Sequence, residues 1–176
     1  MKIIGLIGKL QSGKTTASNF ILDYYDAIKL SFGDPVKEMI LNAGLCNIEE
    51  LWGVKTPFSR LMLQKIGTDI IRKQVDNNFW INKSKEKILK IKNENSNSLI
   101  VFDDVRFINE AELIKTFDNI LIRITRPNIE RNNIEDKHDS EIEQDLINVN
   151  YEIINDGDLE QLRNKIINVI KNIENG

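Results

Sequence analysis

Short apolar runs alternate along this chain with longer stretches in which apolar residues recur every three or four positions. Five runs have the length of a buried strand, at residues 2–7, 27–32, 99–102, 120–125 and 151–154. Strands that alternate with helices favour a parallel sheet with right-handed crossovers. The pattern therefore predicts an α/β fold in which a five-stranded parallel sheet is flanked by helices.

The helical stretches carry recognisable start signals. Helical spacing is found at residues 36–44, 58–75, 79–91, 110–117 and 159–170. Asp34 before the helix at residues 36–44 and Asp158 before the last helix are expected as N-caps, with Pro35 at a first helical position. Three of these helices lie between the second and third strands, which predicts a helical insertion there.

A glycine-rich segment separates the first strand from the helix that follows it. Residues 8–15 read Gly-Lys-Leu-Gln-Ser-Gly-Lys-Thr and fit the phosphate-binding P-loop pattern G-x-x-x-x-G-K-[ST]. Glycines let the backbone N–H groups converge on an anion, and the start of the helix adds its positive dipole end. Lys14 would contact β- and γ-phosphates, and the Thr15 hydroxyl could bind Mg²⁺.

Composition and charge exclude several classes of partner. The net charge of −3 argues against binding to a polynucleotide, which usually requires a basic surface. One cysteine, Cys46, excludes an internal disulfide and a cysteine zinc cluster, and we expect it to be a small packing residue. No apolar run approaches a membrane span, so we expect a soluble, cytoplasmic protein.

Charged residues follow the third and fourth strands. Asp103 and Asp104 come directly after an apolar run, where a carboxylate could hold Mg²⁺ beside a P-loop or could cap the next turn. Arg106 and Glu110 are four residues apart, as in a surface pair or in a guanidinium held for a phosphate. Arg126 ends the fourth strand.

Two further segments allow both a plain and a functional interpretation. Arg60, Gln64 and Gly67 fall three and four residues apart, which on an α-helix gives either a solvated face or a wall towards a substrate. Residues 128–144 are polar and contain Arg131 and His138, the latter being the sole histidine. This segment is either a solvated surface stretch or a lid over phosphates.

The order of these features favours a P-loop kinase of a small molecule that resembles nucleoside monophosphate kinases. A GTPase would need an Asn-Lys-x-Asp turn, whereas residues 82–85 read Asn-Lys-Ser-Lys. A regulatory nucleotide-binding protein is the remaining alternative, although it would not need so many charged residues at strand ends.

Several segments together resemble the deoxynucleoside monophosphate kinases of large DNA viruses and bacteriophages. The resemblance covers nearly the whole chain and includes Ser12-Gly13-Lys14, residues 60–69, Phe79-Trp80, Asp104-Val105-Arg106 with Glu110, Arg126-Pro127, residues 136–138 and Asn155-Asp156-Gly157. The wider group also resembles animal-type phosphomevalonate kinase, which leaves a second acceptor open. Thr15 stands where the family often has aspartate, and Lys9 carries the basic residue that relatives have one or two positions later.

The resemblance implies a set of roles for residues of this chain. It implies Mg²⁺ as cofactor, ATP as phosphoryl donor and a (deoxy)nucleoside monophosphate as acceptor. Catalytic roles fall on Lys14, Arg126, Arg106 and Asp104, with Thr15, Asp103 and Asp104 at the metal. ATP would contact Gly8, Gln11, Ser12, Gly13, Lys14, Thr15, Thr16, Asn155 and Gly157, with the segment Asn155-Asp156-Gly157 beside its adenine. The acceptor would contact Lys9, Phe32, Arg60, Gln64, Gly67, Trp80, Arg106 and Glu110, and the lid would carry Arg131 and His138.

These assignments divide a single kinase domain, residues 1–176, into three parts. The core is expected at residues 1–33, 98–126 and 149–176, the substrate-binding helices at about 34–97 and the lid at about 127–145. The resemblance would place a viral enzyme in the host cytoplasm. The oligomeric state is left open, a homodimer included.

Overall fold

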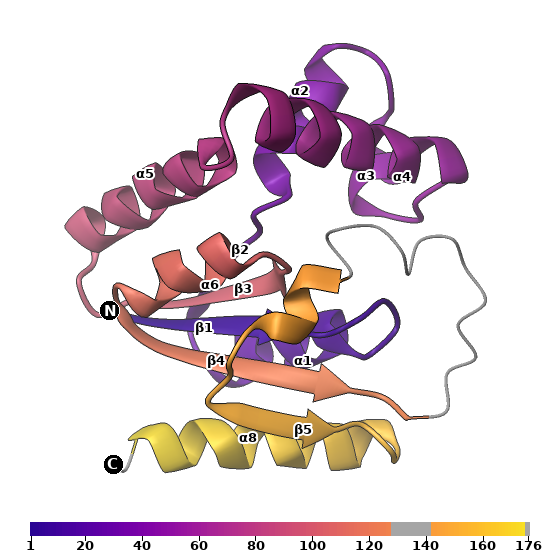
Figure 1. Ribbon diagram of the computed structural model, residues 1–176. Coiled ribbons are helices and arrows are strands. Elements are labelled where there is room, and N and C mark those ends of the chain that lie inside the picture. Colours follow the sequence, from indigo (N-terminus) through magenta and orange to yellow (C-terminus); the bar gives the residue numbers. More distant parts are fainter. Residues whose placement is uncertain (128–141, 175–176) are drawn as a thin grey trace. The chain divides into compact units, whose positions relative to one another are not determined.

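A computed structural model describes residues 1–127 and 142–174 of the chain (Figure 1). The chain divides into two compact units, residues 1–30 with 91–176 and residues 31–90. The first unit contains the sheet and the second unit is helical.

Five parallel strands form one sheet in the first unit, as predicted. In chain order they are β1 Lys2–Ile7, β2 Ala27–Leu30, β3 Leu99–Val105, β4 Asp118–Thr125 and β5 Tyr151–Ile154. Their spatial order is β2-β3-β1-β4-β5, and every neighbouring pair is parallel. β1 therefore lies in the middle of the sheet, and the loop that follows it opens at the centre of the carboxyl edge.

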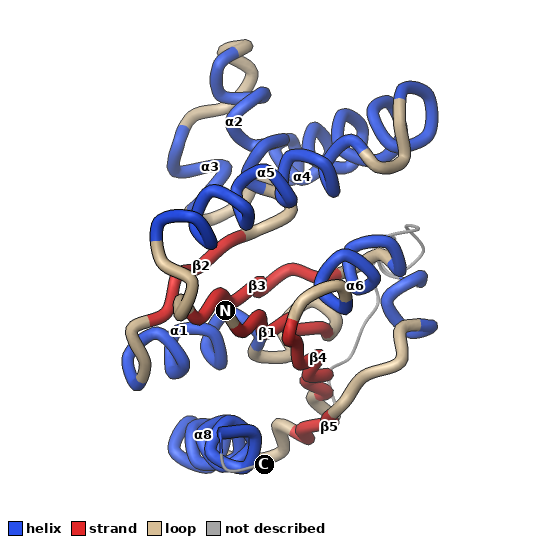
Figure 2. Tube along the Cα trace, turned by 90° about the vertical axis from the view of Figure 1, so that its left-hand side faces the viewer, coloured by secondary structure: helices blue, strands red, loops and turns tan. Residues whose placement is uncertain are grey.

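Helices cover both faces of this sheet. The helices and turn of the first unit are α1 Lys14–Tyr24, α6 Ile108–Lys115, the 3₁₀ turn η3 Glu143–Leu146 and α8 Leu159–Glu174. Figures 1 and 2 show α1 and α8 side by side on one face and α6 on the opposite face. Ile4, Ile122 and Ile166 belong to the fully or almost fully buried core between the sheet, α1 and α8.

The second unit has a small core of its own. Its elements are α2 Asp34–Asn42, α3 Ile48–Trp52, α4 Pro57–Gln64 and the π-helix η1 Lys65–Val75, and α5 Phe79–Glu94 begins in it. Val36, Ile40, Cys46, Leu51 and Trp80 are buried together. Cys46 is thus the packing residue that the sequence predicts, and burial, together with nearby Glu50, raises the pKa of its thiol.

The structure corrects three local expectations. β2 ends at Leu30, because the Gly33 N–H donates to the Ser31 hydroxyl in the turn that follows. Gly33, and not Asp34, occupies the N-cap of α2, and Asp34 lies within the helix without a side-chain capping bond. β3 continues to Val105, so the aspartates expected after the strand lie inside it.

Other expected ends are confirmed. Asp158 Oδ1 accepts a hydrogen bond of 2.9 Å from the Gln161 N–H at the start of α8. Gly44, at a left-handed φ of 69°, follows the end of α2, as the sequence predicts for a helix terminus. Within residues 1–127 and 142–174, no helix combines the length and the apolar character that crossing a membrane would need.

Candidate functional site

The P-loop connects β1 to α1 and depends on two glycines that have no room for a side chain. Gly8 has a φ of 153°, and a Cβ atom there would lie 2.3 Å from the carbonyl oxygen of Ile124 on β4. Gly13 has a φ of 105°, and its Cβ would lie 2.6 Å from Nδ2 of Asn155. The loop is also closed by a 3.1 Å hydrogen bond from the Ser12 N–H to the Lys9 carbonyl. The two motif glycines are therefore required by backbone conformation and by close neighbours.

Lys14 is the first residue of α1 and extends back over the loop. Its ammonium group donates hydrogen bonds to the carbonyl oxygens of Gly8 and, at 2.9 Å, of Lys9. A cation held along a ring of backbone groups is placed to meet an anion bound in the loop. The remaining predicted contacts lie in the same turn: Gln11 and Thr15 are exposed, Thr16 is half-buried, and the buried Ser12 hydroxyl has no hydrogen-bond partner among the described residues.

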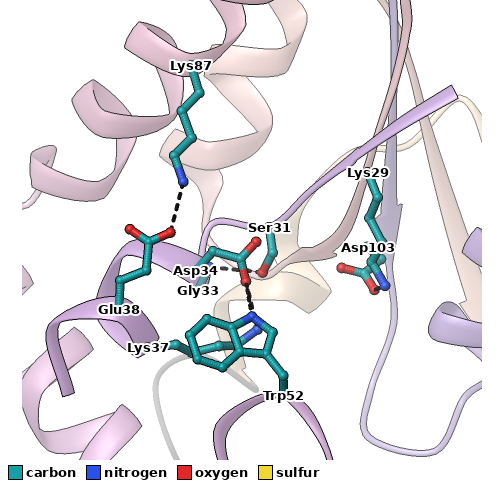
Figure 3. Close-up of polar contacts among 9 residues, drawn as sticks. All are labelled: Lys29, Ser31, Gly33, Asp34, Lys37, Glu38, Trp52, Lys87 and Asp103. Atoms are coloured by element: carbon teal, nitrogen blue, oxygen red, sulfur yellow. Dashed lines mark hydrogen bonds and ion pairs between the residues drawn. The ribbon is translucent and has the colours of Figure 1, made fainter. Parts of the chain in front are cut away.

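A bulge in β3 contains the two candidate metal carboxylates. β1 pairs Gly5 with Phe102 and Ile7 with Val105, so Asp103 and Asp104 both lie opposite Leu6. Asp103 forms an ion pair with Lys29 of β2, at 2.6 Å between Nζ and Oδ2 (Figure 3). Because a bulge breaks the alternation of side chains, sequence alone could not say which aspartate faces the metal.

Arg106 follows β3 in a turn that Glu110 organises from α6. The Glu110 side chain is 3% exposed, and its Oε2 accepts the backbone N–H groups of Arg106 at 2.8 Å and Phe107 at 3.2 Å. This carboxylate therefore fixes the backbone that carries the half-buried Arg106. Arg126 is exposed directly after β4, the strand next to β1.

The turn after β5 contacts the P-loop. Asn155 is 8% exposed, its N–H donates to Thr125 at 2.7 Å, and its Nδ2 donates to the Ser12 carbonyl at 2.9 Å. Asp156 pairs with Lys165 of α8 at 2.6 Å, and the hydrogen bond from this lysine lowers the pKa of the carboxyl group. Gly157 is exposed, and a Cβ there would meet the Gln161 side chain.

The turn η3 contacts Lys9, the basic residue of the P-loop. Asp145 accepts the Lys9 ammonium at 2.8 Å and also lies 3.7 Å from the guanidinium of Arg123 on β4. Arg123 in turn donates to the carbonyl oxygens of Gln144 and Ile147 at 3.2 and 2.6 Å. The segment that follows residues 128–141 is thus tied to the sheet and to the loop.

The expected acceptor residues outside the sheet lie in the second unit. Arg60 and Gln64 are half-buried and lie four apart on α4, as predicted. Gly67 falls in η1, where the π-helical winding changes the spacing, so the expected three-residue stripe ends at Gln64. Trp80 is 3% exposed and donates from Nε1 to the Gly67 carbonyl at 2.8 Å. Phe32 is also buried, at 3% exposure.

A polar cluster that the sequence analysis did not identify surrounds the start of α2. Asp34 accepts hydrogen bonds from Lys37 at 2.9 Å and from the indole N–H of Trp52 at 3.2 Å, and the Lys37 ammonium lies 5.5 Å from the Trp52 ring centre (Figure 3). Elsewhere in this unit, the hydrogen bond from Lys65, together with Lys73, lowers the pKa of Asp69.

The lid residues Arg131 and His138 lie outside the described residues. The other expected residues of the sheet unit lie at or just after the carboxyl ends of β1, β3, β4 and β5. Lys29 and Asp145 were missed. The position of Lys29 inside a short strand could have indicated it, whereas no local feature of the sequence marks Asp145.

The comparisons with known proteins agree on one family. Residues 40–166 match the model of the family described as deoxynucleotide monophosphate kinase. The chain is 32% identical over 191 residues to a protein of Acanthamoeba polyphaga mimivirus named "Putative deoxynucleotide monophosphate kinase", covering 98% of this chain and 97% of the relative. It is 30% identical over 125 residues to the deoxynucleotide monophosphate kinase of Enterobacteria phage T4, covering 71% of this chain and 48% of that enzyme.

Solved structures support the fold. A dephospho-CoA kinase from Campylobacter jejuni matches with a TM-score of 0.58 and 18% identity, and the alignment covers 98% of each chain. The shikimate kinase of Aquifex aeolicus matches with a TM-score of 0.51 and 14% identity, covering 100% of this chain and 99% of that one. At such identities the likeness confirms the P-loop kinase fold and carries no statement about substrates.

Proposed function

Because the chain belongs to the deoxynucleotide monophosphate kinase family, we propose that it transfers the γ-phosphoryl group of Mg·ATP to a (deoxy)nucleoside monophosphate. Membership makes it an ATP-dependent phosphotransferase of the P-loop type. The donor's β–γ P–O bond breaks, a bond forms between the γ-phosphorus and an oxygen of the acceptor phosphate, and the products are ADP and a nucleoside diphosphate.

The observation that carries this proposal is the shaped P-loop at the centre of the sheet's carboxyl edge. Its two glycines have conformations and neighbours that exclude side chains, and Lys14 lies across it. Such a loop binds a chain of phosphates through backbone N–H groups. In the proposed reaction Lys14 and residues 8–15 hold the β- and γ-phosphates, and Thr16, Asn155 and Gly157 complete the donor site.

The acceptor phosphate is already an anion, so the reaction needs no general base. Catalysis then consists of positioning and of neutralising charge on the transferred group. Arg106, on the turn fixed by Glu110, is proposed to hold the acceptor phosphate, and Arg126 to approach the transferred group. Arg131 and His138 keep their proposed place in the lid.

The oxygen donors near the P-loop fit Mg²⁺. The candidates are the Thr15 hydroxyl and the carboxylates of Asp103 and Asp104, all hard ligands. In residues 1–127 and 142–174 no group of three or more His, Cys, Asp and Glu side chains is arranged to hold a metal. This suits an ion that keeps several waters and is bound partly by substrate phosphates. When bound, Mg²⁺ would neutralise charge on those phosphates.

Of the two carboxylates, Asp103 has a defined ion pair: its Oδ2 lies 2.6 Å from Nζ of Lys29, and an ammonium at that distance offsets part of the negative charge that a cation would need. Both aspartates stay candidates for the metal, and matched substitutions decide between them.

The proposed acceptor residues of the second unit differ in how far they are buried. Arg60 and Gln64 share a face of α4, and Lys9 would contribute from the P-loop. Trp80 and Phe32 are buried and Trp80 bonds to Gly67, so in this structure the indole holds η1 against α5. Their contact with the base and sugar stays a prediction.

The test is a coupled assay of ADP release with Mg·ATP and a panel of acceptors. The panel holds dTMP, dGMP, dCMP, dAMP, the matching ribonucleotides and phosphomevalonate. Turnover with one or more nucleoside monophosphates supports the proposal. Turnover with phosphomevalonate alone would show that the acceptor is this compound and not a nucleotide. ATP binding without turnover of any acceptor would support a regulatory nucleotide-binding protein instead.

A further inference from the structure

The P-loop backbone needs partners for the carbonyl groups that point out of the loop. When successive N–H groups converge on an anion, the planar trans peptide turns the carbonyl of each preceding residue the opposite way. A buried carbonyl without a hydrogen bond is costly, so its partner helps to decide the shape of the loop. The peptide bond between Ser12 and Gly13 has such a partner in Asn155.

Asn155 reaches this peptide from the other end of the chain. Its Nδ2 donates to the Ser12 carbonyl at 2.9 Å, and its own N–H donates to Thr125 at the end of β4 at 2.7 Å. Asn155 as a whole is almost fully buried, at 8% exposure. A residue bonded to both β4 and the loop holds one position, because neither partner can move without breaking a bond.

The neighbouring glycine shows how closely Asn155 fits. Gly13 has a φ of 105°, and a Cβ atom there would lie 2.6 Å from Nδ2 of Asn155 and 3.4 Å from Leu162 of α8. The amide therefore occupies the space that a side chain at residue 13 would take. Residue 13 can therefore carry no side chain while the Asn155 amide occupies this position.

We propose that Asn155 is a positioning residue for the phosphates of ATP, acting through the P-loop rather than through the adenine. By holding the Ser12 carbonyl outward, it points the Gly13 N–H in the opposite direction, towards the anion in the loop. This inference rests on the proposed role of the P-loop, and it replaces a base contact for Asn155 with a backbone one.

The first test separates phosphate positioning from adenine contact. Asn155→Ala removes the donor, and the dissociation constants of Mg·ATP and of inorganic tripolyphosphate with Mg²⁺ are measured by titration calorimetry. Both should become weaker by the same factor, about tenfold, since one carbonyl is left unpaired. Loss of ATP affinity with unchanged tripolyphosphate affinity would overturn the inference, and so would wild-type affinity for both.

The second test restores the hydrogen-bond donor at residue 155 by protonating a carboxylate. Asn155→Asp has nearly the shape of the native side chain, but its carboxylate can only accept hydrogen bonds. Below the pKa of this buried carboxyl its O–H can donate to Ser12, so the ratio of variant to wild-type dissociation constants for ATP should fall from pH 8 to pH 5.5. The ratio for Asn155→Ala should stay constant, and equal pH profiles for the two variants would contradict the proposal.

Two controls complete the design. Asn150→Asp makes the same chemical change just before β5, where the native side chain already accepts from the Leu121 N–H at 2.8 Å, and it should bind ATP as the wild type does at every pH. Lys14→Ala tests the premise. Wild-type ATP affinity in Lys14→Ala would mean that the P-loop role itself is wrong, whereas lost affinity there with normal binding in both Asn155 variants would reject the inference alone.

Discussion

At the scale of single residues, the site depends on which charges already have partners. Asp103 and Asp104 are neighbours in the sequence with the same chemistry, and a bulge places both of them opposite Leu6. Lys29, one strand away, forms an ion pair with Asp103 at 2.6 Å. A buried or half-buried charge that is paired within the protein is less available to a ligand.

Two matched substitutions test which aspartate serves the metal. If Asp104 holds it, Asp104→Asn should lower kcat by about 100-fold or more and raise the Mg²⁺ concentration needed for half-maximal rate, since a group that holds transition-state charge is lost. Asp103→Asn should stay within about fivefold of the wild type, because the amide oxygen can still accept from Lys29. The measurement is kcat as a function of Mg²⁺ concentration. A larger loss of kcat in Asp103→Asn than in Asp104→Asn would assign the metal to Asp103.

At the scale of elements, two connections decide how the P-loop is held. The turn after β5 bonds to Ser12 on one side of the loop, and η3 pairs with Lys9 on the other. η3 is itself anchored, because Ile108 at the start of α6 donates to Glu143 at 2.9 Å, and Arg123 donates to one carbonyl within η3 and to the carbonyl of the residue that follows it. Short segments far from the motif thus shape its surroundings.

The pair between Lys9 and Asp145 predicts an effect on the acceptor. If Lys9 contacts the acceptor phosphate, Asp145 competes with that anion for the same ammonium. Asp145→Asn should therefore lower the KM of the acceptor by about two- to fivefold with little change in kcat, in line with the small strength of exposed pairs. The difference should shrink in 0.5 M salt.

Steady-state kinetics with the preferred acceptor at two salt concentrations provide the check. Glu112→Gln is the matched control, because Glu112 forms a similar exposed pair with Lys115 on α6, 3.7 Å apart. A higher acceptor KM in Asp145→Asn would show that the carboxylate positions Lys9 and does not compete for it.

The long helical segment of residues 57–75 shows a limit of pattern reading at the same scale. Its apolar spacing predicts a helix, and the structure has one, but the winding changes from α to π at Lys65. Because the number of residues per turn differs, a face defined by Arg60 and Gln64 does not continue to Gly67. Periodicity identifies helical backbone and cannot by itself detect such a change.

At the scale of the whole molecule, the chain has two compact units with separate cores. The P-loop and the turn after β5 belong to the first unit, and both tryptophans, Trp52 and Trp80, belong to the second. Tryptophan fluorescence therefore reports on residues 31–90, whereas circular dichroism reports on the helices and strands of both units.

This separation predicts how ATP changes unfolding. Saturating Mg·ATP stabilises the state that binds it, by about 2.7 kcal/mol at 100 times the dissociation constant. In urea, the midpoint followed by circular dichroism should rise more than the midpoint followed by fluorescence, since the proposed donor site lies in the first unit. Coincident midpoints that shift equally would instead indicate one cooperative unit.

The strands, most of the helices, the P-loop and the family could be predicted from the sequence alone. Each of these rests on signals within a few neighbouring residues: the spacing of apolar positions, the two motif glycines, the motif segments that resemble viral and phage kinases. The parallel α/β sheet followed from the alternation of elements, and both the fold and the membership in the family are confirmed.

The strand order, the bulge at Asp103 and Asp104, and the partners that hold the P-loop depend on the folded chain. Asn155 and Ser12 are 143 positions apart, and Lys9 and Asp145 are nearly as distant. Nothing local in the chain marks such pairs, because they exist only once the sheet has brought the carboxyl ends of β1, β4 and β5 to the same edge.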